Sequence, residues 1–413
     1  FLIAMTAIAF AFMLGPRTPV YYAAYVLIPG MQRFRAPTRF LLIVELGLVL
    51  LGALGLTRLG MELRQRWKGP AVVARWVGAA ICVVTALDLL VHQSRQNAFV
   101  PAAAWLAPPR TAAVIHRDSP APRTFTPRHR DIHRRVHAGD ARGWTNAAPF
   151  FNLRDLLEPD TGGGYWNIPS ADCYVGLAPR WYVMVWSYHY YENAIIHDLA
   201  LQDFDTAALD ITPPFVNLLR TYGVTHVLSP YPGQDSGLTL VAREPNAYIY
   251  RVERAQRVRV VRAARRVPTE AHAAARLRQP GFDPDREILL LDAPPSVDPR
   301  AGQDDTPPDG APGHATITRE DPREIVIRTT APEDGFLLLA DTYYPGWQAQ
   351  VDGIPTPIYR ANISVRGVAL PGGEHTVRFV YEPLPFFRGL RVTLVALGAI
   401  FLWLGVAAYR LHV

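Results

Sequence analysis

The sequence predicts a membrane protein with transmembrane α-helices plus a large extracytoplasmic α+β region ending in an antiparallel β-sandwich. Three observations lead to this fold class. Apolar runs of membrane-spanning length lie near both ends of the 413 residues. The mean hydropathy is +0.05 although 19% of the residues are charged, a mixture typical of membrane helices beside a polar domain. A dense pattern of strand and turn signals fills residues 335–391, just before the last apolar run.

The charge balance is basic, with 42 Lys and Arg against 36 Asp and Glu. Lys68 is the only lysine, and this bias together with abundant Ala and Pro indicates the codon usage of a GC-rich bacterial genome. The sequence has no arginine-rich helix or mixed aromatic and basic motif, so we expect no nucleic-acid partner. Cys82 and Cys173 lie in an apolar run and a polar region, so we expect no disulfide framework.

Residues 1–91 are predicted to hold the first membrane helices. The apolar run 1–14 is too short to span a hydrocarbon core of about 30 Å. Because the chain begins inside this run without Met, we interpret it as a truncated helix of a longer protein. Residues 18–39 carry tyrosines and arginines and suit an interfacial segment. Full spans are predicted at 40–59 and 71–91.

The connection between these two spans sets the predicted orientation of the chain. Basic residues cluster around it: Arg58, Arg64, Arg66, Lys68 and Arg75. Short basic connections stay in the cytoplasm, so the block from 92 to 385 is predicted to be extracytoplasmic. Residues 386–413 then form a C-terminal transmembrane helix and a short cytoplasmic tail. The predicted location is the bacterial cytoplasmic membrane, as a multi-pass protein with a large extracytoplasmic domain.

Residues 92–297 are predicted to form an α+β region. Helix signals at 214–222 and 269–277 alternate with strand signals at 224–228, 248–252, 258–261 and 288–292. Residues 298–313 are rich in Pro, Gly and Asp without apolar residues, so we predict a linker or long loop there.

Residues 314–385 are predicted to form the β-sandwich, with roughly five to seven strands. The strongest strand signals are at 336–340, 347–351, 363–370 and 375–381. Pro345-Gly346 and Asp352-Gly353 separate the first strands, and Asp352-Gly353 suits a two-residue hairpin turn. Pro355 and Pro357 cannot donate ladder hydrogen bonds, so their segment is predicted to be an edge strand or irregular.

Five stretches of the sequence resemble the YfhO-like family of bacterial polytopic membrane proteins. They are FRAPTRFLL (34–42), VNLLRTYGVTHVLSP (216–230), PGFDPDREILL (280–290), DTYYPGWQAQVDGIPTPIYRAN (341–362) and PGGEHTVRFVYEP (371–383). The last two are the specific part of the resemblance, which extends over about the whole chain. The aromatic region around residues 162–185 matches more loosely.

The resemblance implies a cell-envelope protein similar to GT-C-type glycosyltransferases, which take sugars from polyprenyl-phosphate carriers outside the membrane. In such enzymes the acidic catalytic residue lies in an early external loop. The resemblance therefore places the catalytic part upstream of Phe1 and predicts that this portion alone is inactive. The implied partners are membrane lipid, a polyprenyl-phosphate sugar and an envelope glycan or polymer acceptor. The alternative is a non-catalytic, membrane-anchored glycan-binding or assembly protein.

Charged residues near the outer ends of the predicted spans form the first candidate site. Glu45 and Asp88 fall inside spanning segments, where ionisable groups are costly and are functional by default. With Arg33, Arg35 and Arg39 they define a candidate lipid-phosphate-binding site in the outer leaflet. In the alternative interpretation, the two acids only neutralise interfacial arginines, or Asp88 is already hydrated.

Residues 146–191 are strongly aromatic and form the second candidate site. Aromatic faces stack on sugar rings, and Trp166, Trp181, Tyr182 and Trp186 are the candidate sugar-contact residues. Aromatic residues at this density more often form a core or a subdomain interface, which is the competing interpretation.

His129, His133 and His137 recur every four residues, a spacing that suits metal ligands on one helix face. Four arginines interleave with them and oppose a divalent cation, so we predict no metal site and no cofactor in this portion. The resemblance leaves room for a divalent metal only in the upstream catalytic part.

The polar and aromatic residues of 341–352 form no nucleophile, base and orienting set. Asp341 and Pro345-Gly346 are better explained as strand-end and turn residues. The chain also contains no Gly-rich phosphate loop and no Ser-centred elbow. Catalytic residues are therefore not assigned to any position of this sequence.

Overall fold

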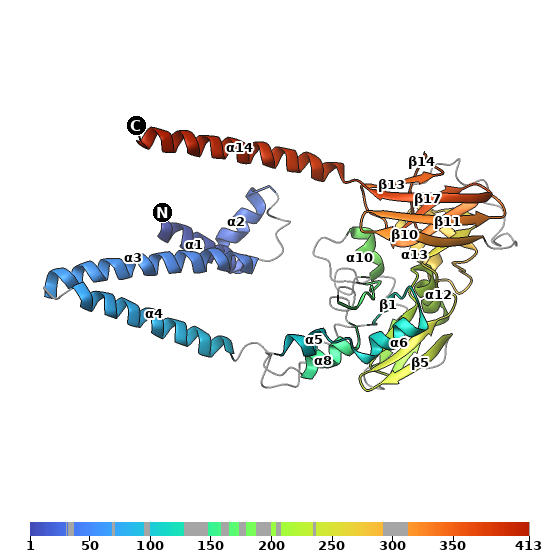
Figure 1. The fold of residues 1–413 in the computed structure, drawn as a ribbon, viewed down its shortest axis with the longest axis horizontal. Coiled ribbons are helices and arrows are strands. Elements are labelled where there is room, and N and C mark those ends of the chain that lie inside the picture. Colours follow the sequence, from blue (N-terminus) through green and yellow to red (C-terminus); the bar gives the residue numbers. More distant parts are fainter. Residues whose placement is uncertain are drawn as a thin grey trace. The chain divides into compact units, whose positions relative to one another are not determined.

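The computed structural model forms two compact units, residues Phe1–Ala98 and Phe99–Val413 (Figure 1). The residues that it describes are 1–29, 31, 37–67, 71–94, 100–127, 148–157, 165–172, 179–186, 200–203, 208–233, 237–291 and 313–412. The first unit is helical, and the second holds the sheets and the last helix.

The described elements of the first unit are α1 (Leu2–Met13), η1 (Gly15–Arg17), α2 (Pro19–Leu27), η3 (Pro37–Phe40), α3 (Leu41–Trp67) and α4 (Ala71–Ser94). The side chain of Thr18 accepts a hydrogen bond from Tyr21 N, which caps the start of α2. Helices α1 and α3 pack closely at Gly47, where an added Cβ would lie 2.0 Å from Thr6 Oγ1. A small residue at this position lets the two helix backbones approach.

Among the residues that the structure describes, two helical segments are long and apolar enough to span a membrane, Pro37–Glu62 and Leu384–Ala407. Only 11% and 0% of their most apolar stretches are buried by protein, so their apolar surface lacks a protein cover in the described part of the chain. Helix α4 is continuous, and Gly78–His92 forms a shorter apolar helix within it. The span predicted at 71–91 therefore stays a prediction.

The second unit begins with a four-stranded sheet in the order β1 (Thr124–Phe125), β4 (His226–Ser229), β6 (Ala247–Val252), β5 (Leu238–Glu244). Helices α6 (Arg110–Asp118) and α8 (Ala148–Asp155) pack on one face, against Leu228 and Ile249. Helix α12 (Pro213–Thr221) packs on the other face, against Val227 and Tyr250. Adjacent residues Val227 and Leu228 point to opposite cores, as strand geometry requires. Further described elements are α5 (Ala102–Leu106), α10 (Arg180–Trp186) and the hairpin β2 (Ala200–Asp203) and β3 (Ala208–Ile211).

The β-sandwich consists of a five-stranded and a six-stranded sheet. The antiparallel five-stranded sheet has the order β10 (His314–Asp321), β11 (Glu324–Ala331), β17 (Gly373–Tyr381), β13 (Trp347–Val351), β14 (Ile354–Thr356). The six-stranded sheet has the order β7 (Val258–Val261), β12 (Gly335–Thr342), β16 (Val365–Leu370), β15 (Tyr359–Ala361), β9 (Glu287–Leu291), β8 (Ala263–Arg266). Ile327, Phe379, Leu337 and Val368 are fully buried between the sheets.

The strands of the six-stranded sheet come from both sides of residues 298–313. We expected the sandwich to begin at residue 314, but β7, β8 and β9 lie earlier in the chain and complete one of its sheets. Strands β8 and β9 are parallel and are joined through α13 (Glu270–Leu277), a crossover helix. Strands β7 and β8 stand at opposite ends of the strand order, yet only Arg262 separates them. The six-stranded sheet is therefore curved, so that its two outermost strands, β7 and β8, can follow one another directly in the chain.

Local turn chemistry explains the hairpin between β13 and β14. Asp352 and Gly353 have φ angles of 50° and 83°, the positive values that a two-residue hairpin turn needs. This confirms the predicted hairpin. Strand β17 then passes through Glu382 and Pro383 into α14 (Leu384–His412), the 29-residue helix that ends the chain.

Candidate functional site

The candidate lipid-phosphate residues are only partly described by the structure. Arg33 and Arg35 lie outside the described residues, whereas Arg39 is exposed in η3. Glu45 is exposed on α3. The side chain of Asp88 on α4 is 71% exposed, and its Oδ1 lies 3.8 Å from Nδ1 of His92, one helical turn later. These positions fit both interpretations given above.

Among the residues that the structure describes, metal-ligating side chains form no cluster that could hold an ion. His129, His133 and His137 lie outside the described residues, as does Cys173. Among the described residues, no group of three or more His, Cys, Asp or Glu side chains lies close enough to hold a metal ion. Cys82 is an exposed free cysteine on α4.

Three of the four candidate sugar-contact side chains are buried in packed cores. Trp166, Tyr182 and Trp186 are each 8% exposed. The ring of Trp186 packs against Tyr222, with centroids 5.1 Å apart. Trp166 donates from Nε1 to the carbonyl of Leu106, 3.3 Å away. Little ring surface remains for a sugar, and this placement favours the interpretation as a core.

Trp181 differs, because it joins α10 to the end of β12. Its Nε1 donates to Tyr343 O at 2.8 Å, and the two rings meet edge to face at 5.8 Å. The guanidinium of Arg360 lies 5.3 Å from the centre of the Trp181 ring, within range of a cation–π contact. The aromatic region 146–191 and the DTYYPGW segment (341–347) are far apart in sequence, but Trp181 brings them into direct contact.

A group of charged residues surrounds Asp341 at the end of β12. We call it the Asp341 cluster: Asp341, Arg123, Arg257, Arg366 and Glu320. Asp341 Oδ1 accepts from Arg123 at 2.6 Å and from Arg257 Nε at 2.9 Å, and Oδ2 accepts from a second nitrogen of Arg257 at 2.8 Å. Arg257 also forms a bidentate pair with Glu320 on β10, at 2.8 Å for each bond.

The Asp341 carboxylate is ionised, and both of its oxygens accept hydrogen bonds from arginines. Burial alone raises its pKa, but the charge of Arg123 and the bonds and charge of Arg257 outweigh burial and hold the pKa well below its usual range. A carboxylate held in this state does not take up a proton near neutral pH. It is thus suited to linking Arg123, β7 and β12, and unsuited to general acid or base chemistry.

Arg366 completes the cluster from β16. It is 4% exposed, its Nε donates to Thr342 O at 3.2 Å, and its guanidinium lies 3.9 Å from the centre of the Trp347 ring. Burial lowers its pKa to about 10, opposed by the charge of Asp341. The side chain stays cationic at neutral pH, and the aromatic face of Trp347 supports that charge.

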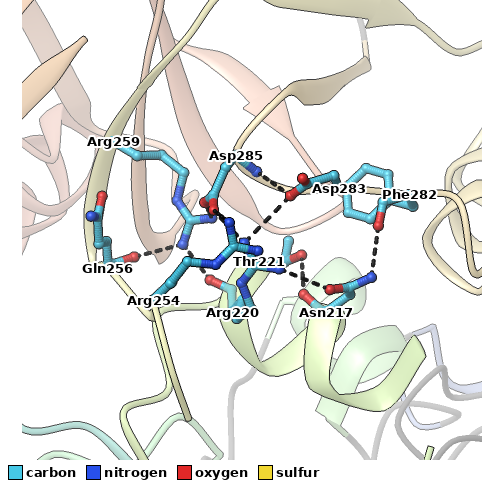
Figure 2. A network of polar contacts seen from close by, with 9 residues as sticks. All are labelled: Asn217, Arg220, Thr221, Arg254, Gln256, Arg259, Phe282, Asp283 and Asp285. Atoms are coloured by element: carbon cyan, nitrogen blue, oxygen red, sulfur yellow. Dashed lines mark hydrogen bonds and ion pairs between the residues drawn. The ribbon is translucent and has the colours of Figure 1, made fainter. Parts of the chain in front are cut away.

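A second group of charged residues, the Asp285 network, joins α12 to the segments before β7 and β9 (Figure 2). Its members are Asn217, Arg220, Arg254, Gln256, Arg259, Asp283 and Asp285. Figure 2 shows three guanidinium groups gathered around Asp285. Asp285 pairs with Arg220, with Arg259 at 3.0 Å and with Arg254 at 3.6 Å.

The two inner arginines of this network are almost fully buried. The side chains of Arg220 and Arg259 are 7% and 3% exposed, whereas those of Asp283 and Asp285 are 34% and 28% exposed. Burial lowers the pKa of Arg259 to about 10, which leaves it charged at neutral pH. Arg259 donates to Gln256 O at 2.9 Å and also to the carbonyl of Arg220, so much of its charge is held by backbone carbonyls.

Three stretches that carry the sequence resemblance contact one another in this region. Residues 216–230 supply Arg220 and residues 280–290 supply Asp285. The hydroxyl of Tyr222 donates to Asn362 O at 2.7 Å, and Asn362 Oδ1 accepts from Leu289 N at 2.9 Å. The three stretches thus form one packed unit around the six-stranded sheet.

Sequence reasoning missed a buried histidine–aspartate pair, formed by His226 on β4 and Asp118 at the end of α6. His226 is fully buried, and its Nε2 lies 2.9 Å from Asp118 Oδ2, while Nδ1 lies 2.9 Å from Thr225 Oγ1. Burial lowers the pKa of His226, and the bond and charge of Asp118 oppose the change. Arg251 also donates to Asp118, at 2.7 Å. These bonds fix α6 on the four-stranded sheet.

Comparisons of the chain with protein-family models, curated proteins and solved structures found no match. In its described residues, the structure shows two helices long and apolar enough to cross a membrane and a large α+β region with antiparallel sheets.

Proposed function

We propose that this chain is the C-terminal part of a YfhO-like integral membrane protein that works in cell-envelope glycosylation with polyprenyl-phosphate sugars. The observation that supports this proposal most directly is the join between the sandwich and a helix that is long and apolar enough to span a membrane. Strand β17, from the most specific stretches of the resemblance, runs through Pro383 into α14. Helix α3 supplies a second apolar helix of spanning length before the α+β region.

In this proposal the α+β region and the sandwich lie outside the bacterial cytoplasmic membrane and position the acceptor glycan. The catalytic acid, and any divalent metal, belong to the upstream part of the protein. Arg33, Arg35, Arg39, Glu45 and Asp88 would bind the lipid phosphate of the sugar carrier. The exposed side chains of Arg39 in η3, Glu45 on α3 and Asp88 on α4 are compatible with that role.

Sugar transfer in isolated membranes tests the enzymatic proposal. Membranes from cells that carry the complete gene, a gene deletion and the restored gene are supplied with labelled polyprenyl-phosphate sugars. We expect label to enter the envelope polymer only where the gene is present. Equal incorporation by the deletion and the parent strain across all donors would contradict the proposal.

A non-catalytic role in glycan binding or assembly is the second candidate. The observation in its favour is that three carboxylates of the α+β region and the sandwich are engaged by arginines. Asp341, Asp285 and Glu287 each pair with at least two guanidiniums and hold separate strands or helices together. If this role is correct, deletion membranes keep sugar transfer to the carrier-linked oligomer but fail to assemble the final polymer.

The proposed topology has its own test, cysteine labelling of intact cells. The labelled position must be exposed and uncrowded. Gly313, just before β10, is unsuitable because an added Cβ would lie 2.7 Å from both Thr330 O and Val260 Cβ. Ile354, which is 69% exposed at the β13–β14 hairpin, accepts a cysteine without such crowding. We expect Ile354→Cys to react with a membrane-impermeant reagent in intact cells. Labelling only after lysis would place the sandwich in the cytoplasm.

A further inference from the structure

The turn before β13 is fastened to the residues just before α14. Glu382 N donates to Gly346 O at 2.7 Å, and the rings of Trp347 and Tyr381 lie 5.3 Å apart. Gly346 has a φ of +106°, and an added Cβ would lie 3.2 Å from Pro383 Cα. Glycine permits both this backbone conformation and this close approach. The turn at residues 344–346 therefore stays beside the first residue of α14.

Both parts of this junction expose apolar and aromatic side chains. Tyr344 is 42% exposed at the tip of the turn. In the first turn of α14, Leu384, Phe386 and Phe387 are 57%, 62% and 39% exposed. Aromatic side chains with exposed faces are typical of the layer where a membrane meets water.

The length of α14 locates this junction relative to a bilayer. Its 29 residues extend about 43 Å at 1.5 Å per residue, well beyond a hydrocarbon core of about 30 Å. Arg388 and Arg391 are exposed near its start, and arginine at the centre of a span is unfavourable. The hydrocarbon-spanning part therefore begins after Arg391, and Leu384–Arg391 falls in the headgroup layer.

We propose that the 344–346 turn and the first two turns of α14 form one lipid-contacting surface, which we call the junction surface. Its occupant is the bilayer headgroup layer: the aromatic rings lie among the headgroups, and Arg388 and Arg391 bind lipid phosphates. This inference rests on α14 being a membrane span, as the proposed function requires. It adds that the sandwich itself touches the membrane, at one defined end.

The opposite end of β13 provides a matched control. Ile354 follows the Asp352–Gly353 turn, is apolar and is 69% exposed, more than Tyr344. Strand β13 has five residues and separates the two ends by about 17 Å. Exposure and apolarity alone therefore predict equal lipid contact at both ends, whereas the junction surface predicts contact at Tyr344 only.

Fluorescence quenching in liposomes tests the junction surface with the full chain. Cys82 and Cys173 are replaced by serine, and an environment-sensitive fluorophore is attached to a single cysteine introduced as Tyr344→Cys, Phe386→Cys, Ile354→Cys or Leu402→Cys. The vesicles contain phosphatidylcholine and phosphatidylglycerol, with a nitroxide either on the headgroup or deep in the acyl chain. Pro345→Cys repeats the measurement at the turn in case Tyr344→Cys disturbs folding.

We expect the headgroup nitroxide to quench the labels at Tyr344 and Phe386 several-fold more than the label at Ile354. The acyl-chain nitroxide should quench the label at Leu402, which lies within the candidate span. If Leu402 is quenched but Tyr344 and Pro345 are quenched no more than Ile354, the junction surface is wrong while the membrane span stands. If neither nitroxide quenches Leu402, both the span and the junction surface are overturned.

Discussion

The Asp341 cluster and the Asp285 network contain the same chemical groups but bury opposite charges. In the Asp341 cluster the carboxylate is the central buried group, with an 11% exposed side chain that contacts Arg123 and Arg257. In the Asp285 network two of the three arginines, Arg220 and Arg259, are the buried groups, and the carboxylates remain about a third exposed. The Asp341 cluster has one buried acid, whereas the Asp285 network divides its negative charge between two partly exposed acids.

Because the buried charge differs between the two networks, we expect them to respond differently when one charged partner is removed. Removing one member of a buried ion pair leaves an uncompensated charge in a region of low dielectric, which is strongly destabilising. Where the remaining charges reach water or a second partner, the same change is milder. Substitutions at Asp341, Asp285 and Glu320 separate these two situations.

Asp341→Asn should have the largest effect on stability. It leaves three buried or half-buried guanidiniums without their shared carboxylate, so we expect a loss of about 3–5 kcal/mol in the free energy of unfolding. For a domain of this size that corresponds to a melting temperature lower by roughly 10 °C. Thermal unfolding of the full chain in detergent, followed by tryptophan emission, measures the change. A melting temperature equal to that of the parent protein would show that Asp341 does not hold the cluster together.

The same residue should govern the acid sensitivity of the fold. The pKa of Asp341 is held below its usual range in the folded state and returns to about 3.9 on unfolding. Its contribution to stability is therefore complete above pH 4 and is lost as the pH falls toward the folded pKa. We expect the melting temperature of the parent protein to fall more steeply than that of Asp341→Asn below pH 4. Parallel curves for the two proteins would refute this assignment.

Asp285→Asn should have an intermediate effect. The amide oxygen still accepts from Arg259, and Asp283 remains 3.4 Å from Arg220 as a second carboxylate. We expect a loss of about 1–3 kcal/mol, within the range for a weakened hydrogen bond to a charged group. The double variant with Asp283→Asn removes both acids, and its loss should exceed the sum of the two single losses. Simple additivity would show that the two acids act independently.

Glu320→Gln should have the smallest effect and serves as the control for Asp341→Asn. Both changes remove a carboxylate that contacts Arg257, but the Glu320 side chain is 49% exposed and Arg257 keeps its contact with Asp341. Exposed ion pairs contribute about 0–1 kcal/mol. A loss as large as that of Asp341→Asn would mean that Arg257, and not the burial of Asp341, determines the stability of the cluster.

Local patterns in the sequence predicted the elements whose signals are local. The Asp352-Gly353 hairpin and the strands at 258–261 and 375–381 depend on turn chemistry and on apolar periodicity within a few residues. Strand β8 was missed because AARR carries no apolar alternation and is a strand only through its pairing with β9. Strand β10 was missed because it is an edge strand of mostly polar residues, none of which is buried.

The role of Asp341 was beyond local reasoning for a different reason. Its partner Arg123 is 218 residues away in sequence and Arg257 is 84 residues away. Sequence alone therefore identified Asp341 only as a strand-end residue. The aromatic band was interpreted with both alternatives open, because density of rings does not reveal burial. The burial of Trp166, Tyr182 and Trp186 in the structure, with Trp186 packed against Tyr222, favours a core.

The segment that carries β7 and β8 (258–266) also determines the order in which the sandwich can fold. Strand β12 pairs with β7 on one side and β16 on the other, so the six-stranded sheet cannot be completed until residue 370, the end of β16, has been synthesised. Contacts between such distant residues form slowly. Until β12 arrives, β7 has a free apolar edge, a feature prone to pairing with other chains. Pairing of β12 with β7 therefore covers an edge that would otherwise be open to other chains.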